Sequence, residues 1–295
     1  MSAVEVARPG GTRPADVGRP GVGARLSTRL LRSELRIIAG RRRNQAGLAV
    51  LAAVPVVMAI AVKVSKPGGG GDGPDFFASI TSNGLFVPLA ALGVEIGMFL
   101  PLAMAMLAGD AIAGEANIGT LRYLLTVPVH RTRLLVVKYV SLCIGAVWGI
   151  CAVALPGALV GIALFGTGEL TTLSGSQIPF GAAVWRLVLV MLYLSAGLAA
   201  LAAVGLFIST LTEQPIAAAI ALMIFTIVSW IMDSVPQLAW LHPWLVVHQW
   251  LAFGDLLRDP IASTNVVSGL LVDAAYAAVF WSLAWARFAG KDITS

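Results

Sequence analysis

Six stretches of the chain are almost free of charged residues and are long enough to form membrane-spanning helices. The hydrocarbon core of a bilayer is about 30 Å thick, which a helix of about 20 apolar residues crosses. The first and fifth stretches are short, and we expect their helices to extend into the flanking residues. The six predicted spans are residues 46–62, 84–108, 139–165, 187–211, 216–232 and 266–286.

The segment before the first span divides into two parts. Residues 1–21 are rich in Gly, Pro and Arg, so we expect a disordered leader. Residues 22–45 are predicted to form a basic amphipathic helix along the inner membrane surface, held by anionic lipid alone or also by a cytosolic partner. Glu34 interrupts its apolar side, and an ion pair is the one explanation that the sequence offers. At 100° per residue, four arginines share the polar face: Arg25, Arg29, Arg32 and Arg36.

The polar stretch 109–138, between the second and third spans, is both cationic and patterned as a helix. Residues 118–126 are good helix formers, and Pro128 ends the helix because the residue before a proline is pushed out of helical geometry. Glu115 would lie near the helix N-terminus, where the dipole favours a carboxylate by about 0.3–1 kcal/mol. We predict a short amphipathic helix across the cytosolic mouth. Three basic residues then mark the lipid boundary of the third span: Arg131, Arg133 and Lys138.

Composition also places the chain in a membrane. Soluble domains are about 45–50% apolar and about 25% charged, whereas this chain of 295 residues is 58% hydrophobic and 12% charged. Sixteen of its basic residues lie in residues 1–45, in the 109–138 stretch and after the last span, against four in the alternate loops. Because basic residues are retained in the cytoplasm, both termini are predicted to be cytoplasmic. The net charge of +5 is therefore a topology signal, and we expect no nucleic-acid partner.

Charged residues inside spans cost about 2.5–3.5 kcal/mol at a helix centre, so each requires a reason. Arg186 and Asp273 have similar predicted depths in the fourth and sixth spans, which favours a structural ion pair between them. Glu95 lies near the middle of the second span between Gly93 and Gly97. It is either a protonated packing group or a group that faces the translocation path or a dimer seam.

The outer segment 233–265 is longer than a simple turn and holds Trp240, Trp244 and Trp250. Aromatic side chains favour the membrane interface, so we expect short helices that dip into the outer leaflet. His242 and His248 are six residues apart, which places them on different sides of a helix. We therefore predict interfacial packing and no metal site.

The order of residues in the 109–138 stretch resembles the loop after the second span of ABC-2 type transporter permeases. The matching pattern is Glu115, Gly119-Thr120-Leu121, Leu124-Leu125, Pro128-Val129, Arg131 and Lys138. The resemblance covers most of residues 22–287 and implies an all-α membrane protein, with an amphipathic helix, six spans and a cytosolic coupling helix. It also implies two partners, namely a cytosolic ABC ATPase subunit that binds ATP and Mg²⁺ and a second permease copy or paralogue. The residues implied in coupling to the ATPase are Glu115, Gly119, Thr120, Leu121, Arg122, Leu125, Pro128 and Arg131.

These features predict a permease domain over residues 46–287, followed by a cytosolic tail over 288–295. The run Gly68–Gly71 is not a phosphate loop because no Lys-Ser or Lys-Thr follows it. We therefore expect no enzymatic activity or cofactor in this chain, which would export a lipophilic or lipid-linked compound across a bacterial plasma membrane with ATP hydrolysed by its partner. Two alternatives remain: an ion-gradient-driven secondary carrier with Glu95 as its proton site, and a non-transporting membrane assembly or immunity factor.

Overall fold

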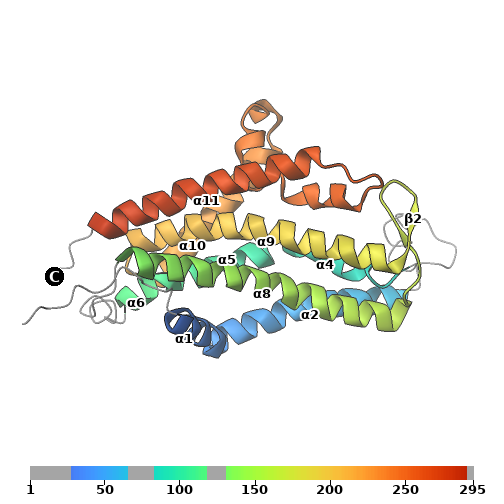
Figure 1. Ribbon diagram of the computed structural model, residues 1–295, viewed down its shortest axis with the longest axis horizontal. Helices are drawn as coiled ribbons and strands as arrows, with labels where there is room; N and C mark the ends of the chain where they lie inside the picture. Colours follow the sequence, from blue (N-terminus) through green and yellow to red (C-terminus); the bar gives the residue numbers. More distant parts are fainter. Residues whose placement is uncertain (1–27, 66–82, 118–130, 291–295) are drawn as a thin grey trace, which may run out of the picture.

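The computed structural model is an elongated helix bundle (Figure 1) that describes residues 28–65, 83–117 and 131–290. Five of the described helices are long and apolar enough to cross a membrane. They are α2 (Arg42–Ser65), α8 (Arg131–Phe165), α9 (Phe180–Leu211), α10 (Pro215–Ser234) and α11 (Thr264–Gly290). The chain is therefore a multi-pass membrane protein, as its apolar runs predict.

The second predicted span is broken into two helices, α4 (Phe86–Glu95) and α5 (Phe99–Ala111). They are bent by 58° relative to each other and are long enough to cross a membrane only together. The break occurs where Met98 leaves helical geometry, with φ of −146°. The described helices thus form five spans, or six when the bent pair counts as one.

Several helices begin or end at different residues from the apolar runs that predicted them. Both α8 and α9 begin before the predicted spans, because helical geometry continues through the basic first turn of α8 and the apolar first turn of α9. Gly166 ends α8 with a left-handed φ of +86°, which favours glycine. A short antiparallel hairpin then joins α8 to α9, with β1 (Leu170–Thr171) paired to β2 (Gln177–Ile178). The predicted all-α fold is correct apart from this hairpin.

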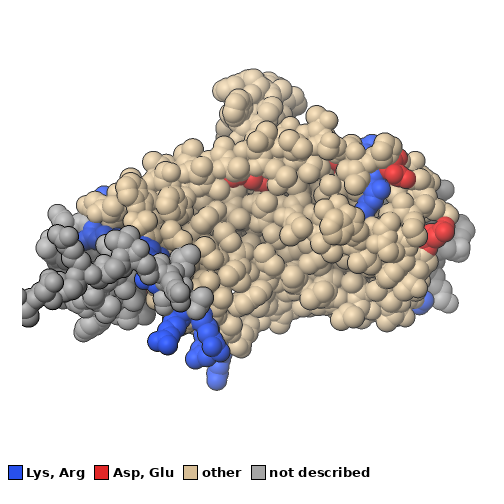
Figure 2. Space-filling view, in the orientation of Figure 1, with Lys and Arg blue, Asp and Glu red and all other residues tan. Residues whose placement is uncertain are grey.

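Helix α9 is the centre of the bundle. Of its most apolar stretch, 61% is buried, against 17–33% in the other four spans. Those four helices therefore turn much of their apolar surface outward, as a lipid-facing helix does. The space-filling view agrees, because the middle of the visible face carries few charged atoms (Figure 2).

One end of the bundle carries α1 (Thr28–Gly40), α6 (Ala113–Asn117) and the carboxyl end of α11, and we call it the α1 end (Figure 1). The hairpin lies at the opposite end. Helix α1 runs across the long axis of the bundle, and the described arginines of its predicted stripe, Arg29, Arg32 and Arg36, are all exposed. The remaining member, Arg25, lies outside the described residues, as do the predicted leader 1–21 and the coupling helix 118–126.

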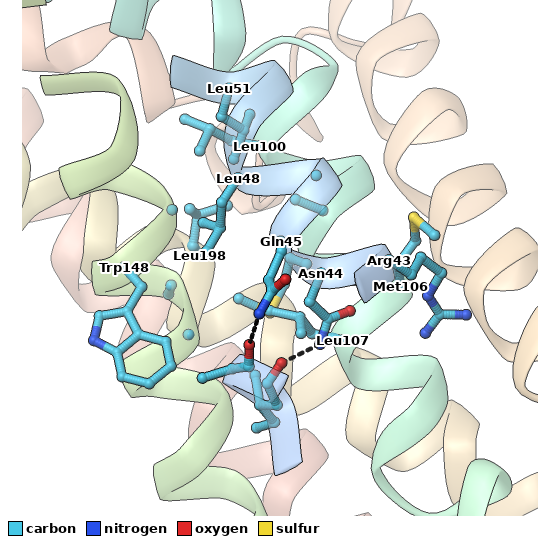
Figure 3. Close-up of a pocket in the computed structure, with 18 residues that line it drawn as sticks. Arg43, Asn44, Gln45, Leu48, Leu51, Leu100, Met106, Leu107, Trp148 and Leu198 are labelled. Carbon is cyan, nitrogen blue, oxygen red and sulfur yellow. Dashed lines mark hydrogen bonds between the residues drawn. The ribbon is translucent and has the colours of Figure 1, made fainter. Parts of the chain in front are cut away.

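The predicted amphipathic helix over 22–45 is wrong at its carboxyl end. The chain leaves helical geometry at Arg41, and α2 begins at the next residue. Two α2 side chains satisfy the last carbonyl groups of α1: the Asn44 amide donates to Ile38 and the Gln45 amide to Ala39, each at 2.9 Å (Figure 3). This elbow allows α1 to lie across the bundle while α2 runs along it.

The segment between α10 and α11 forms three short 3₁₀ helices, η1 (Pro236–Leu238), η2 (His242–Trp244) and η3 (Trp250–Leu257). Trp240 and Trp244 are exposed, but Trp250 is buried in the core. Because no single helix joins His242 to His248, the spacing argument that separated them fails, and their ring centroids are 5.6 Å apart.

Candidate functional site

A buried cluster of opposite charges lies at the α1 end, centred on Lys138 of α8. Its ammonium donates to both carboxylate oxygens of Glu34 on α1 at 2.9 Å, and it pairs with Glu115 on α6. Lys138 is 4% exposed and Glu34 is 7% exposed. The three contacts occupy all three N–H groups of the ammonium. We call Glu34, Glu115 and Lys138 the buried charge cluster.

The position of Lys138 corrects its predicted place at the lipid boundary. Along α8, Leu134, Lys138 and Leu142 are all buried, at the four-residue spacing that puts side chains on one face of a helix. That face packs against α1, so Lys138 points inward. Glu34, which interrupts the apolar side of α1, is its partner.

Electrostatics explain why these residues occur together. An unpaired buried charge is costly, and each carboxylate here is compensated by the one ammonium. Burial raises the pKa of the Glu115 carboxyl above its usual range, while the charge of Lys138 counteracts part of that rise. The cluster joins α1, α6 and α8 through the two ion pairs of Lys138.

A second charged group lies beside this cluster. Arg41, at the elbow, and Arg43, in the first turn of α2, both pair with Asp110 near the end of α5. Asp110 is 12% exposed, whereas the two arginines remain partly open to solvent. Together the two groups contain three acidic and three basic side chains, so their formal charges cancel.

Ser209 of α9 holds the junction between α5 and α6. Its hydroxyl oxygen accepts from the backbone N–H groups of Ile112 (3.1 Å) and Ala113 (2.9 Å), and the hydroxyl donates to the Gly109 carbonyl (3.1 Å). Ser209 is completely buried. The Ser209 side chain thus supplies hydrogen bonds to the backbone groups left free where α5 ends. This break in the helix places Glu115 near Lys138.

Ser209→Ala is expected to lower the free energy of unfolding by about 1–2 kcal/mol, because two buried N–H groups lose their acceptor. Thermal unfolding of the detergent-purified protein measures this change. Ser282→Ala is the matched control, since the Ser282 hydroxyl bonds only to a carbonyl of its own helix on an exposed face. Equal unfolding midpoints for the two variants would contradict the bridging role of Ser209.

Arg131 fastens the start of α8 to the end of α11. Its guanidinium donates to the Ala289 carbonyl at 2.9 Å and to the Phe288 carbonyl at 3.4 Å. A cation is favoured there because the carbonyl groups at a helix C-terminus are partly negative. Next to it, the Trp285 indole N–H donates to the Thr132 hydroxyl at 2.9 Å.

Two of the predicted coupling residues are described, and they flank the rest. Glu115 precedes the undescribed stretch 118–130 and Arg131 follows it. Each is bonded to a different helix, Glu115 to α8 and Arg131 to α11. The other predicted coupling residues lie outside the described residues: Gly119, Thr120, Leu121, Arg122, Leu125 and Pro128.

The predicted Arg186–Asp273 ion pair is wrong. The Arg186 guanidinium donates to the Leu256 carbonyl at 2.9 Å and lies 3.5 Å from Asp259, because the chain after η3 folds over this end of α9. Asp273 lies instead near Gly197, where an added Cβ would be 3.6 Å from its carboxylate. Gly197 is about 16 Å further along α9 at 1.5 Å per residue, so the two charges are at different depths.

Glu95 is the last residue of α4, at the bend before α5. It is fully buried, and neither carboxylate oxygen has a hydrogen-bond partner within the described ranges. In this conformation its side chain therefore lies inside the chain and not on its outer surface.

Three hollows border the α1 end, and the smallest, of about 30 Å³, lies between the two charged groups. The other two are larger. The one under the elbow has a volume of about 60 Å³ and is lined by α2, α5 and α8, with Leu48, Leu100 and Trp148 around it (Figure 3). The other is a groove of about 420 Å³ between α5 and α10, with apolar walls and with Arg43 and Asp110 among its lining residues. Small-molecule sites usually measure about 300–1,000 Å³, so only the groove has the size of a ligand site.

The family comparison covers most of the spans. A family model described as a protein of unknown function (DUF2705) matches residues 82–294. The chain belongs to this family. None of the curated proteins matches the chain. The DUF2705 match includes Asp110, Glu115 and Lys138, whereas Glu34 and the elbow arginines precede it. The charged groups of the α1 end therefore join the DUF2705 region to the helices before it.

Sequence reasoning missed several residues of this site. A charge on the apolar side of α1, as at Glu34, requires a partner, and Lys138 at a core-facing position of α8 was a readable signal for it. Asp110 adjoins the apolar run of the second span, which is a similar signal. Ser209 had none, because a serine near a helix end is common in any membrane protein.

Proposed function

We propose that this chain is the permease subunit of an ATP-driven ABC-2 type exporter, with six spans and both termini in the cytosol. The observation that carries the proposal is the buried charge cluster. It connects Glu115, three positions before the 118–130 stretch, to the transverse helix α1 and to α8. A partner that moves this stretch would act on these helices together.

The contact on the other side of the 118–130 stretch supports the same proposal. Arg131, at its other end, bonds to the carboxyl end of α11. Force applied between Glu115 and Arg131 would therefore reach both the first and last parts of the permease. For the partner to move the spans through the 118–130 stretch, this stretch must contact them through such a continuous set of residues.

Charge supports the proposed orientation. The exposed arginines of α1 lie at the end that also holds α6 and the carboxyl end of α11, and Figure 2 shows a cluster of basic side chains there. Basic residues are retained on the cytoplasmic side of a membrane. The α1 end would thus face the cytosol of a bacterial cell, where an ABC ATPase subunit binds.

The groove between α5 and α10 supports a lipophilic or lipid-linked substrate. Its walls are formed by side chains such as Met106, Ile220 and Ile224, while Arg43 and Asp110 lie at its α1 end. The apolar walls would contact the hydrocarbon tail of such a substrate, and the charged end of the groove would contact its polar head group. A second permease copy or paralogue would complete the path.

Phosphate release tests the proposal. The purified chain alone is expected to hydrolyse no ATP, and hydrolysis in membranes should require a co-expressed ABC ATPase subunit. Leu121→Asp should abolish co-purification with that ATPase and transport, because a charge would enter an apolar contact. Leu173→Asp, on the exposed hairpin at the opposite end, is the control for an added charge. Hydrolysis by the chain alone, or normal transport by Leu121→Asp, would overturn the proposal.

One observation favours a second candidate, a carrier driven by an ion gradient. Glu95 is a buried carboxyl with no hydrogen-bond partner in the described part of the chain, and it lies at a 58° helix break. Broken helices form ion sites in secondary transporters. Glu95→Gln retains the shape and removes the ionisable proton. A carrier should lose proton-coupled transport in this variant, whereas an exporter of an uncharged compound should keep ATP-driven transport. Transport in vesicles, energised by ATP or by a pH gradient, separates the two candidates.

A further inference from the structure

Three side chains with metal-binding atoms meet where α10 ends. Asp233, His242 and His248 each contribute one ligand atom, and these atoms all lie within 4.8 Å of one another. The Nδ1 atom of His248 is 2.5 Å from the Asp233 carboxylate. All three side chains are partly buried. They come from α10, from η2 and from the turn before η3, so the chain must fold back to assemble them.

The local fold orients the His242 ring. Its Nε2 atom is 3.1 Å from the Val235 carbonyl, which can only accept a hydrogen bond, so Nε2 carries the proton. The lone pair of the neutral ring is then at Nδ1. Histidines that bind metals almost always donate their other ring N–H to a carbonyl or carboxylate in this way. The hydrogen bond to Val235 thus fixes the His242 ring with its Nδ1 lone pair available to a metal ion.

The charge around the three residues also favours a cation. Asp233 is in the last turn of α10, where the carbonyl groups at the helix C-terminus are partly negative. Among the described residues, Asp233 forms its ion pair with His248 and with no Lys or Arg. A metal ion bound at Nδ1 of His248 would take the place of the proton on that atom, and the neutral ring would carry its proton on Nε2 instead.

We propose that Asp233, His242 and His248 bind one divalent transition-metal ion of the zinc class. Two imidazoles and one carboxylate are a ligand set that zinc accepts, with a fourth tetrahedral position left for water. Ligands of one zinc ion are about 3.3 Å apart at the usual bond lengths, so Asp233 and His248 must separate slightly when it binds. The ion would clamp the end of α10 to the segment that carries Trp250 into the core.

Cobalt titration tests this site because tetrahedral Co²⁺ has visible absorption bands that report its ligands. The full chain is purified in detergent with an affinity tag that contains no histidine, stripped with a chelator and titrated with Co²⁺ and then Zn²⁺. We expect one tightly bound ion per chain and displacement of Co²⁺ by Zn²⁺. Asp233→Asn, His242→Gln and His248→Gln should each weaken binding by at least about tenfold.

His130→Gln is the matched control. His130 is the remaining histidine of the chain, is not one of the three proposed ligands and lies outside the described residues. It should bind Co²⁺ like the wild type. As a second readout, Zn²⁺ should raise the thermal unfolding midpoint of the wild type and leave that of the His242→Gln/His248→Gln double variant unchanged. A wild-type chain that binds no tetrahedral Co²⁺, or a loss in His130→Gln as large as in His248→Gln, would overturn the site. Either result would leave an ordinary Asp–His hydrogen bond.

Discussion

Lys138→Met is expected to lower the free energy of unfolding by about 3–5 kcal/mol, because it leaves Glu34 and Glu115 buried with no ammonium between them. Methionine has nearly the length and volume of lysine, so the change removes the charge with little loss of packing. Thermal unfolding in detergent and the fraction of monodisperse protein after purification measure the effect.

Arg36→Met is the control for losing a basic residue at the α1 end, because Arg36 is exposed on α1. Its unfolding midpoint should stay close to the wild type. Glu34→Gln combined with Lys138→Met should recover part of the loss, since it removes the charge of the more buried of the two carboxylates that Lys138 contacts. Similar midpoints for Lys138→Met and Arg36→Met would contradict the role of the buried charge cluster.

Gly161→Ala is expected to have the second largest effect on stability, about 3 kcal/mol. An added methyl group at Gly161 of α8 would overlap the backbone carbonyl of Gly84, which precedes α4. The neighbouring Gly84 N–H also donates to the Gly166 carbonyl at 3.1 Å, so the two segments are tied together where they touch. Overpacking against a backbone costs about 1–3 kcal/mol and occasionally more, since no side chain can rotate away.

Gly47→Ala is the matched control, because an added methyl group there meets nothing within 4 Å. Gly47 is also helical, so alanine should be neutral or should stabilise α2 by up to about 1 kcal/mol. Gly161→Ala is therefore expected to lower the thermal unfolding midpoint, whereas Gly47→Ala should leave it unchanged or raise it. A Gly161→Ala protein at least as stable as the wild type would show that α4 and α8 are not in backbone contact.

The spans were predictable because each depends on the composition of one continuous stretch. The apolar runs located α2, α8, α9, α10 and α11, and each helix extends beyond its run at one end or at both. The bend between α4 and α5 was not predictable from hydropathy, since residues 96–98 are as apolar as their neighbours. Gly93, Gly97 and Pro101 marked a weak point without indicating its angle.

The site was less predictable because its contacts join residues far apart in the chain. Glu34 and Lys138 are each unusual in their own helix, but only the packing of α1 on α8 pairs them. Arg186 shows the opposite case. A partner of the right charge was available in Asp273, yet backbone carbonyl groups at the end of η3 and just after it bind the guanidinium. The histidines were separated by assuming a helix where the chain turns.

The distance in sequence between Glu34 and Lys138 has a consequence for how the protein is made. The two residues are 104 positions apart, and chains grow at about 5–20 residues per second, so the lysine follows the glutamate by about 5–20 seconds. During that interval two spans have been synthesised, but the acid on α1 has no counter-charge and must remain hydrated at the membrane surface. Helix α1 therefore docks only after the third span arrives, which makes its docking a late step of biogenesis although it is the first described helix to leave the ribosome.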